Sequence, residues 1–143
     1  MEHKKTTDEL KNEICSARDM DKFLKSNDNE FSSEQIGERL CELIKENGLK
    51  KSEVVARSGL NRIYAYQILS GKKKPSRDKL ISFGFGLQLS LEEMDRLLLF
   101  SGYAQLYARN KRDAIIIFAI QNRKSVFAAN EMLYDNGFDI FTS

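Results

Sequence analysis

The chain of 143 residues contains no tryptophan, one proline, one histidine and two cysteines. Proline interrupts helices, so its scarcity favours a helical chain. Cys15 and Cys41 form no C-x-x-C pair, and together with His3 they make no set with metal-ligand spacing. Cys41 is interpreted as a small packed hydrophobe. We therefore expect no disulfide framework, no metal, no other cofactor and a reducing, cytoplasmic environment.

Long apolar runs and enzyme motifs are also missing. The longest apolar run is residues 114–120, far shorter than the roughly 20 residues that cross a bilayer. The N-terminal residues have no apolar centre of the kind found in signal peptides. No G-x-S-x-G, Walker-type or dinucleotide-binding glycine motif occurs, and Arg112-Asp113 is interpreted as a helix cap and surface pair. We expect neither a membrane span nor an enzyme.

Positive charge gathers in the middle of the chain. Between Gly48 and Leu80 there are nine lysines and arginines and only two acids, Glu53 and Asp78, although the net charge of the whole chain is only +2. Such a local positive field suits a polyanion such as nucleic acid. A lysine run by itself is more often a solvated loop, so this charge must be weighed together with the helices around it.

The N-terminal segment, residues 1–31, is acidic and carries apolar residues at helical spacing. This spacing predicts one or two amphipathic helices, and a frayed acidic leader is the alternative. The candidate caps are Thr6 with Glu9 and Ser16 with Asp19.

The middle segment, residues 32–101, is predicted to hold five helices. Their expected positions are 33–47, 51–58, 62–70, a fourth that begins after Ser76 and a fifth that begins after Ser90. Ser90 and Glu93 have the spacing of a capping box, which marks the start of the fifth helix. Gly84 and Gly86 are expected to weaken the end of the fourth helix, each by roughly 1 kcal/mol relative to alanine.

The C-terminal segment, residues 102–143, is predicted to add two helices. Asn110 precedes residues 114–120, a β-branched run that suits either a buried strand or a buried helix. We favour a helix because no second strand exists to pair with it. Ser125 caps the next helix, residues 126–136. The apolar faces of this pair form a dimer or partner surface, or else cover the fifth helix within one subunit. The predicted fold class is therefore all-α.

Residues 49–75 carry the most specific pattern, a short helix, a glycine turn, a second short helix, a closing glycine and a lysine run. This stretch resembles the helix-turn-helix of phage-repressor-type regulators (lambda repressor/Cro-like, XRE family). The matching positions are Val54, Val55, Gly59, Leu60, Ala65, Ile68 and Gly71, and the phrase SGKKKP is similar to the family ending NGKRxP. Val55 departs from the family, which usually has alanine there. The resemblance implies a five-helix DNA-binding domain over residues 33–101.

The same resemblance implies how double-stranded DNA would be bound, with the second motif helix in the major groove. Arginine can pair with guanine and glutamine with adenine through two hydrogen bonds. The residues expected to meet base edges are Asn61, Arg62, Ile63, Tyr66 and Gln67. The residues expected to meet phosphates are Lys51, Ser52, Tyr64, Lys72, Lys73, Lys74 and Arg77. Tyr64 and Tyr66 have the alternative of packing on neighbouring helices.

The function predicted from these features is a sequence-specific transcriptional regulator. We expect a repressor that binds a palindromic operator as a homodimer, because such modules bind two half-sites about one DNA turn apart. The alternative is an antitoxin or adaptor that holds a partner protein through its C-terminal helices and regulates its own synthesis through the helix-turn-helix. A small-ligand sensor is less favoured, because residues 102–143 are too few for an obvious ligand domain.

Overall fold

The computed structural model describes residues 33–141, which form seven α-helices and, within this range, no strand. The helices are α3 (Ser33–Glu46), α4 (Lys51–Ser58), α5 (Arg62–Leu69), α6 (Arg77–Gly86), α7 (Leu91–Phe100), α8 (Lys111–Gln121) and α9 (Val126–Asp135). The all-α prediction is confirmed for these residues. The expected N-terminal helices, their caps and Cys15 lie outside the described residues.

Polar caps begin most of these helices where the sequence predicted them. Ser76, Ser90, Asn110 and Ser125 each accept the main-chain N–H of the third residue that follows, at 3.3, 3.2, 2.9 and 3.1 Å. Ser90 and Glu93 form the expected capping box at the start of α7. Residues 114–120 lie within α8, so the prediction of a helix in place of a strand is confirmed. The first, third and last predicted helices each end one residue earlier than expected.

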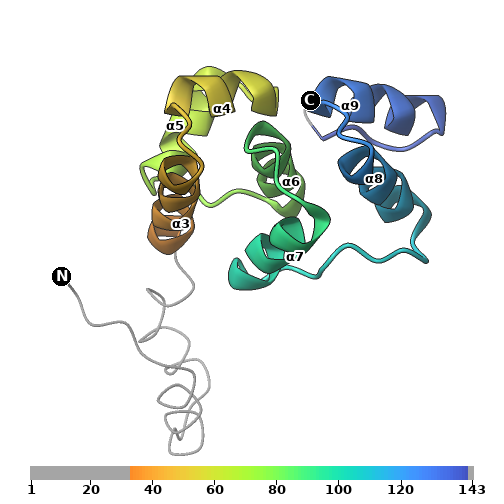
Figure 1. The fold of residues 1–143 in the computed structure, drawn as a ribbon, viewed down its shortest axis with the longest axis horizontal. Coiled ribbons are helices and arrows are strands. Elements are labelled where there is room, and N and C mark those ends of the chain that lie inside the picture. Colours follow the sequence, from red (N-terminus) through yellow and green to blue (C-terminus); the bar gives the residue numbers. More distant parts are fainter. Residues whose placement is uncertain (1–32, 142–143) are drawn as a thin grey trace, which may run out of the picture.

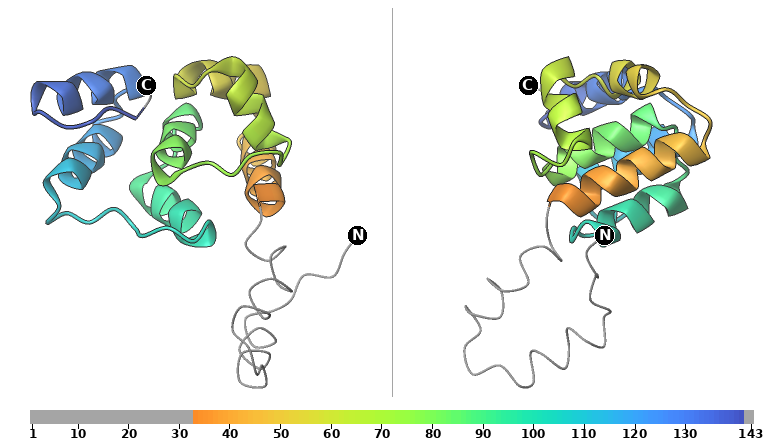
Figure 2. Two further views of the ribbon diagram at one scale, coloured as in Figure 1. Left: turned by 180° about the vertical axis from the view of Figure 1, so that it is seen from behind. Right: turned by 90° about the vertical axis from the view of Figure 1, so that its left-hand side faces the viewer.

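The helices are arranged in three groups. Figure 1 shows α6 and α7 in the middle, with α3, α4 and α5 on one side and α8 and α9 on the other, and the reverse view in Figure 2 agrees. The main helix contacts are those of α4 with α6, α3 with α5 and α8 with α9. A single hydrophobic core runs through all three groups, with Leu40, Val54, Ile68, Phe83, Met94, Ile116 and Leu133 fully buried.

Two glycines allow pairs of helices to approach closely. A Cβ atom added at Gly86 would lie 2.5 Å from the carbonyl oxygen of Val54, and one added at Gly37 would lie 2.8 Å from that of Ile68. Both contacts are with backbone, which cannot move aside as a side chain could. Gly84 and Gly86 were expected to weaken the end of the fourth predicted helix, which is α6, but α6 continues through Gly86. Glycine is required at position 86 because the backbone of α4 lies directly against α6 there.

The C-terminal helices pack on the rest of the same subunit. Ile116, Ile120, Val126 and Leu133 belong to the common core, α8 contacts α7, and α9 contacts α6. The inward faces of α8 and α9 therefore cover the domain within one subunit, which was one of the two expectations for this pair. Phe118 remains 51% exposed on the outer side.

Two ion pairs cross between α6 and α8. The guanidinium of Arg77 binds the carboxylate of Asp113, and that of Arg112 binds the carboxylate of Asp78, with N–O distances from 2.9 to 3.1 Å. Arg112 and Asp113 are thus not merely a cap and surface pair, because each joins α8 to α6. Only 7% of Asp113 is exposed. None of the described helices combines the length and the apolar character that a membrane crossing requires.

Candidate nucleic-acid interface

The turn between α4 and α5 is fixed by local hydrogen bonds. Gly59 has a φ of +71°, a left-handed conformation that suits glycine, and its N–H donates to the carbonyl of Ala56. The hydroxyl of Ser58 donates to the Val55 carbonyl at 2.6 Å and accepts the N–H of Leu60 at 3.2 Å. Leu60 is buried. The relative position of α4 and α5 is therefore determined by the residues of the turn itself.

The first turn of α5 projects into solvent. Ala65 and Ile68 are fully buried, as expected for the inward side, whereas Asn61, Arg62 and Ile63 are exposed. Ile63 is 72% exposed, which is unusual for a large apolar side chain and suits a contact with another molecule. The first turn of α5 is thus accessible and is not covered by other parts of the described chain.

Local contacts order several of the α5 residues that are expected to meet bases. The side-chain carbonyl of Asn61 accepts the N–H of Tyr64 at 3.1 Å, so Asn61 caps α5 and keeps its amide N–H groups for another acceptor. Tyr66 and Gln67 are half-buried. The guanidinium of Arg62 lies 5.9 Å from the centre of the Tyr66 ring, a cation–π distance that orders the arginine along the helix.

The start of α4 has free main-chain donors. Its N-cap residue is Lys50, which makes no side-chain capping hydrogen bond, whereas the five helices α5 to α9 all have a side-chain cap. Lys51 and Ser52 are exposed. An uncapped helix N-terminus offers its first N–H groups and its positive dipole end to an anion, so this site suits a DNA phosphate.

The lysine run after α5 is ordered from two sides. Lys72, Lys73 and Lys74 are exposed, and the N–H groups of Lys72 and Lys73 donate to the carbonyl of Gln67 at 2.9 and 3.3 Å. Tyr64 is half-buried against the core, and the ammonium groups of Lys73 and Lys79 lie 5.7 and 5.8 Å from the centre of its ring. Tyr64 therefore packs on the domain and positions two lysines.

Tyr103 is a residue of this region that sequence reasoning missed. Its hydroxyl donates to the carbonyl of Pro75 at 2.6 Å, and the ammonium of Lys74 lies 5.5 Å from its ring centre. Burial, and secondarily the charge of Tyr64, raises the pKa of the Tyr103 phenol, so the hydroxyl stays protonated and able to donate well above neutral pH. No local signal identifies Tyr103, because it is 28 residues from Pro75 in the chain.

Arg77, which was expected to contact a phosphate, is engaged by its own chain. Beyond the two hydrogen bonds to Asp113, its Nε donates to the carbonyl of Ala104 and its Nη2 to that of Gln105, both at 3.0 Å. Four donor contacts with its own chain leave this guanidinium little capacity for a phosphate. The sequence could not show this, because Asp113 is 36 residues away. Arg77 instead holds the C-terminal segment on α6.

The other cations of the surface have no acidic partner among the residues that the structure describes. Within residues 33–141 the ion pairs are made by Arg39, Arg77, Arg96 and Arg112. The cations that flank α5 without such a pair are Lys50, Lys51, Arg62, Lys72, Lys73, Lys74 and Lys79, and we call them the basic rim. Together the rim and the exposed turn of α5 supply positive charge, hydrogen-bond donors and one exposed apolar side chain, Ile63.

This geometry defines an all-helical domain with a solvent-exposed helix and a cationic rim. Comparison of the chain with protein-family models, with curated proteins and with solved structures finds no match. Within the described residues, no group of three or more histidine, cysteine, aspartate or glutamate side chains is arranged to hold a metal ion. Cys41 contacts α5, where its Sγ lies 3.6 Å from the Leu69 carbonyl oxygen, as a packed side chain would.

Proposed function

We propose that this protein is a sequence-specific DNA-binding transcriptional regulator of the phage-repressor (XRE) type, without enzymatic activity. In this proposal α4 and α5 are the helix-turn-helix, and α5 enters the major groove of double-stranded DNA. The observation that carries the proposal is the accessible first turn of α5, with Asn61, Arg62 and Ile63 exposed and with the basic rim making no ion pair within residues 33–141.

Sequence would be read by the α5 side chains. Arg62 can donate two hydrogen bonds to a guanine, and the Asn61 amide can donate to a base acceptor while its carbonyl caps the helix. Ile63 can contact a thymine methyl group. Tyr66 and Gln67 are half-buried, so they reach DNA only at the part of the groove closest to the helix axis.

Affinity would come from phosphate contacts on both sides of α5. Lys51, Ser52 and the free amides of α4 bind one phosphate region, and Lys72, Lys73 and Lys74 bind another. The ring of Tyr64 orders Lys73 and Lys79, and the ring of Tyr103 orders Lys74. These three side chains therefore lose less conformational freedom when they bind DNA. About five phosphate contacts give a log–log salt slope of roughly −5 for each copy.

The proposed biological action is repression in the cytoplasm, by a homodimer that covers a promoter at a palindromic operator. Leu99 and Phe100, at the end of α7, are 54% and 53% exposed and are available for contact between two copies. The second candidate is an antitoxin or adaptor with a protein partner on the outer side of α8 and α9. The observation that favours it is the exposure of Phe118 and Tyr134 on these two helices.

Selection of bound duplexes from a random pool tests this function. We expect a consensus sequence with two inverted half-sites whose centres are about one helical turn apart. Recovery of unrelated sequences at every salt concentration would contradict sequence-specific binding. A consensus without inverted symmetry would support sequence-specific binding but contradict the proposed homodimer.

A further inference from the structure

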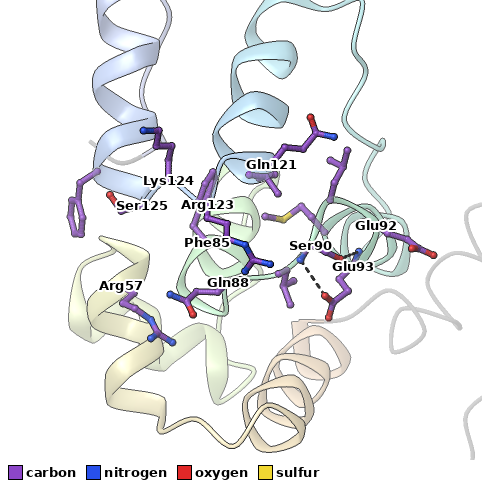
Figure 3. Close-up of a pocket in the computed structure, with 15 residues that line it drawn as sticks. Arg57, Phe85, Gln88, Ser90, Glu92, Glu93, Gln121, Arg123, Lys124 and Ser125 are labelled. Atoms are coloured by element: carbon purple, nitrogen blue, oxygen red, sulfur yellow. Dashed lines mark hydrogen bonds between the residues drawn. The ribbon is translucent and has the colours of Figure 1, made fainter.

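A cavity of about 800 Å³ lies between the end of α4, the α6–α7 turn and the α8–α9 turn (Figure 3). None of the residues expected to contact DNA lines it. Apolar side chains cover part of its wall, among them Phe85, Leu89 and Phe127. Cavities of this size are typical of sites that hold a small organic molecule.

The charged side chains of this cavity leave it positive. Arg57 and Arg123 line it, and neither makes an ion pair within residues 33–141. The two lining acids are already engaged, since the carboxylate of Glu93 accepts the N–H of Ser90 at 3.2 Å and that of Glu92 pairs with Arg96. Figure 3 shows Arg57, Gln88 and Arg123 pointing toward a common space, with Glu92 directed away from it.

One nitrogen of the Arg57 guanidinium is hydrogen-bonded to the backbone, and another has no partner among the described residues. Its Nε donates to the carbonyl of Gly86 at 3.0 Å. Its Nη2 is buried and has no hydrogen-bond partner among the described residues. Buried donors are almost always paired, so the unpaired nitrogen of a residue that lines the cavity indicates an acceptor other than the described residues, such as a bound anion or a water. A guanidinium fixed through Nε can bind an oxyanion through its two other nitrogens.

The backbone gives an independent indication at Gln88 and Arg123. Each of the seven described helices is followed by a residue with positive φ, and after five of them that residue is glycine. After α6 and α8 it is Gln88 (φ 57°) and Arg123 (φ 53°), the only described non-glycine residues with positive φ. Both line the cavity. Most of the described helices end with glycine in this conformation because other side chains are strained there, and such strain clusters at functional sites.

We propose that this cavity binds a small organic anion, a carboxylate or a phosphate ester, between Arg57 and Arg123. The side-chain amide of Gln88 donates a further hydrogen bond to the anion, and the apolar part of the anion lies on Phe85, Leu89 and Phe127. The site is separate from the DNA surface, and its occupation does not depend on the proposed regulatory function. Because Arg57 is on α4 and Arg123 follows α8, the bound anion joins the two outer groups of helices.

The test uses the full chain and three probes in NMR titrations. Benzoate and phenyl phosphate carry an aromatic ring with a carboxylate or a phosphate, and benzyl alcohol is the neutral counterpart. We expect saturable shifts of the amides around Gln88 and Arg123 with at least one anion at millimolar concentration, and none with benzyl alcohol. The stronger anion tells which oxyanion the site prefers. If neither anion gives saturable shifts there, the proposal is overturned.

Variants separate this role from a structural one. Arg123→Gly removes the cation and relieves the positive φ, so the thermal unfolding midpoint should stay close to that of the unchanged protein while the anion affinity falls by roughly tenfold or more. Gln88→Gly should weaken binding to a smaller degree. Arg109→Gly removes an exposed cation outside the cavity and should leave binding unchanged. Equal loss in Arg123→Gly and Arg109→Gly, or no loss in either, would reject the site.

Discussion

At the scale of single residues, Arg62 and Lys73 are expected to contribute to DNA binding in different ways. Arg62 is exposed at the start of α5, where a guanidinium reaches base edges. Lys73 lies in the loop after α5 and is held over the ring of Tyr64. On the proposed DNA surface, a lysine in that position would contact a phosphate, which is the same at every base pair. Under the proposed function, we therefore expect Arg62 to supply specificity and Lys73 to supply affinity.

Substitution of these two residues gives a direct comparison. Arg62→Ala should cost about 1–3 kcal/mol on the selected duplex and relax the preference at one base pair of each half-site. Lys73→Ala should weaken binding to all duplexes alike and reduce the salt slope by about 1. Fluorescence anisotropy with selected and scrambled duplexes measures both effects. Unchanged affinities in both variants would show that these contact assignments are wrong.

At the scale of helices, the position of α4 depends on Gly86. A methyl group there would meet the backbone carbonyl of Val54, whereas one at Gly84 would meet the flexible thioether of Met94. Gly86→Ala should lower the free energy of unfolding by about 1–3 kcal/mol, because the clash outweighs the better helix propensity of alanine. Gly84→Ala is the matched control and should cost less. Urea unfolding measures both, and the reverse order would contradict this account of α4 packing.

The sequence predicts helices well where the signal is local. Ser90, Asn110 and Ser125 mark helix starts because a side-chain oxygen near free N–H groups acts within one turn. The outward side of α5 follows from apolar spacing in the same way. Gly86 could not be interpreted from local sequence, since what it contacts is the backbone of another helix. Helix propensity alone predicts only that such a glycine destabilises its helix.

At the scale of the whole molecule, the crossed ion pairs between α6 and α8 join the C-terminal segment to the rest. The carboxylate of Asp113 is bound by Arg77 and by the N–H of Tyr107, and it is almost entirely buried. Asp113→Asn leaves Arg77 without its counter-charge and should lower the free energy of unfolding by about 2–4 kcal/mol. Glu92→Gln, in an exposed pair with Arg96, should cost less than about 1 kcal/mol.

Denaturant unfolding measured on both variants tests this prediction, and equal small effects would contradict it. From the sequence, Arg77 was predicted to contact a phosphate and Asp113 to lie at the surface, because a pattern of charges does not show which distant residues meet. Tyr103 and Arg123 were not predicted as site residues for the same reason. Their contacts and the cavity are formed by helices that are far apart in the chain. Tertiary contacts of this kind need the folded structure.

The measurement that bears most directly on the central proposal is the affinity of the purified protein for a selected duplex and for a scrambled duplex of the same composition. The account predicts that the selected duplex binds more tightly by roughly 10³ or more, and that both affinities fall steeply as salt rises. Equal affinity for the two duplexes, or no binding to either at low salt, would contradict the placement of α5 in the major groove.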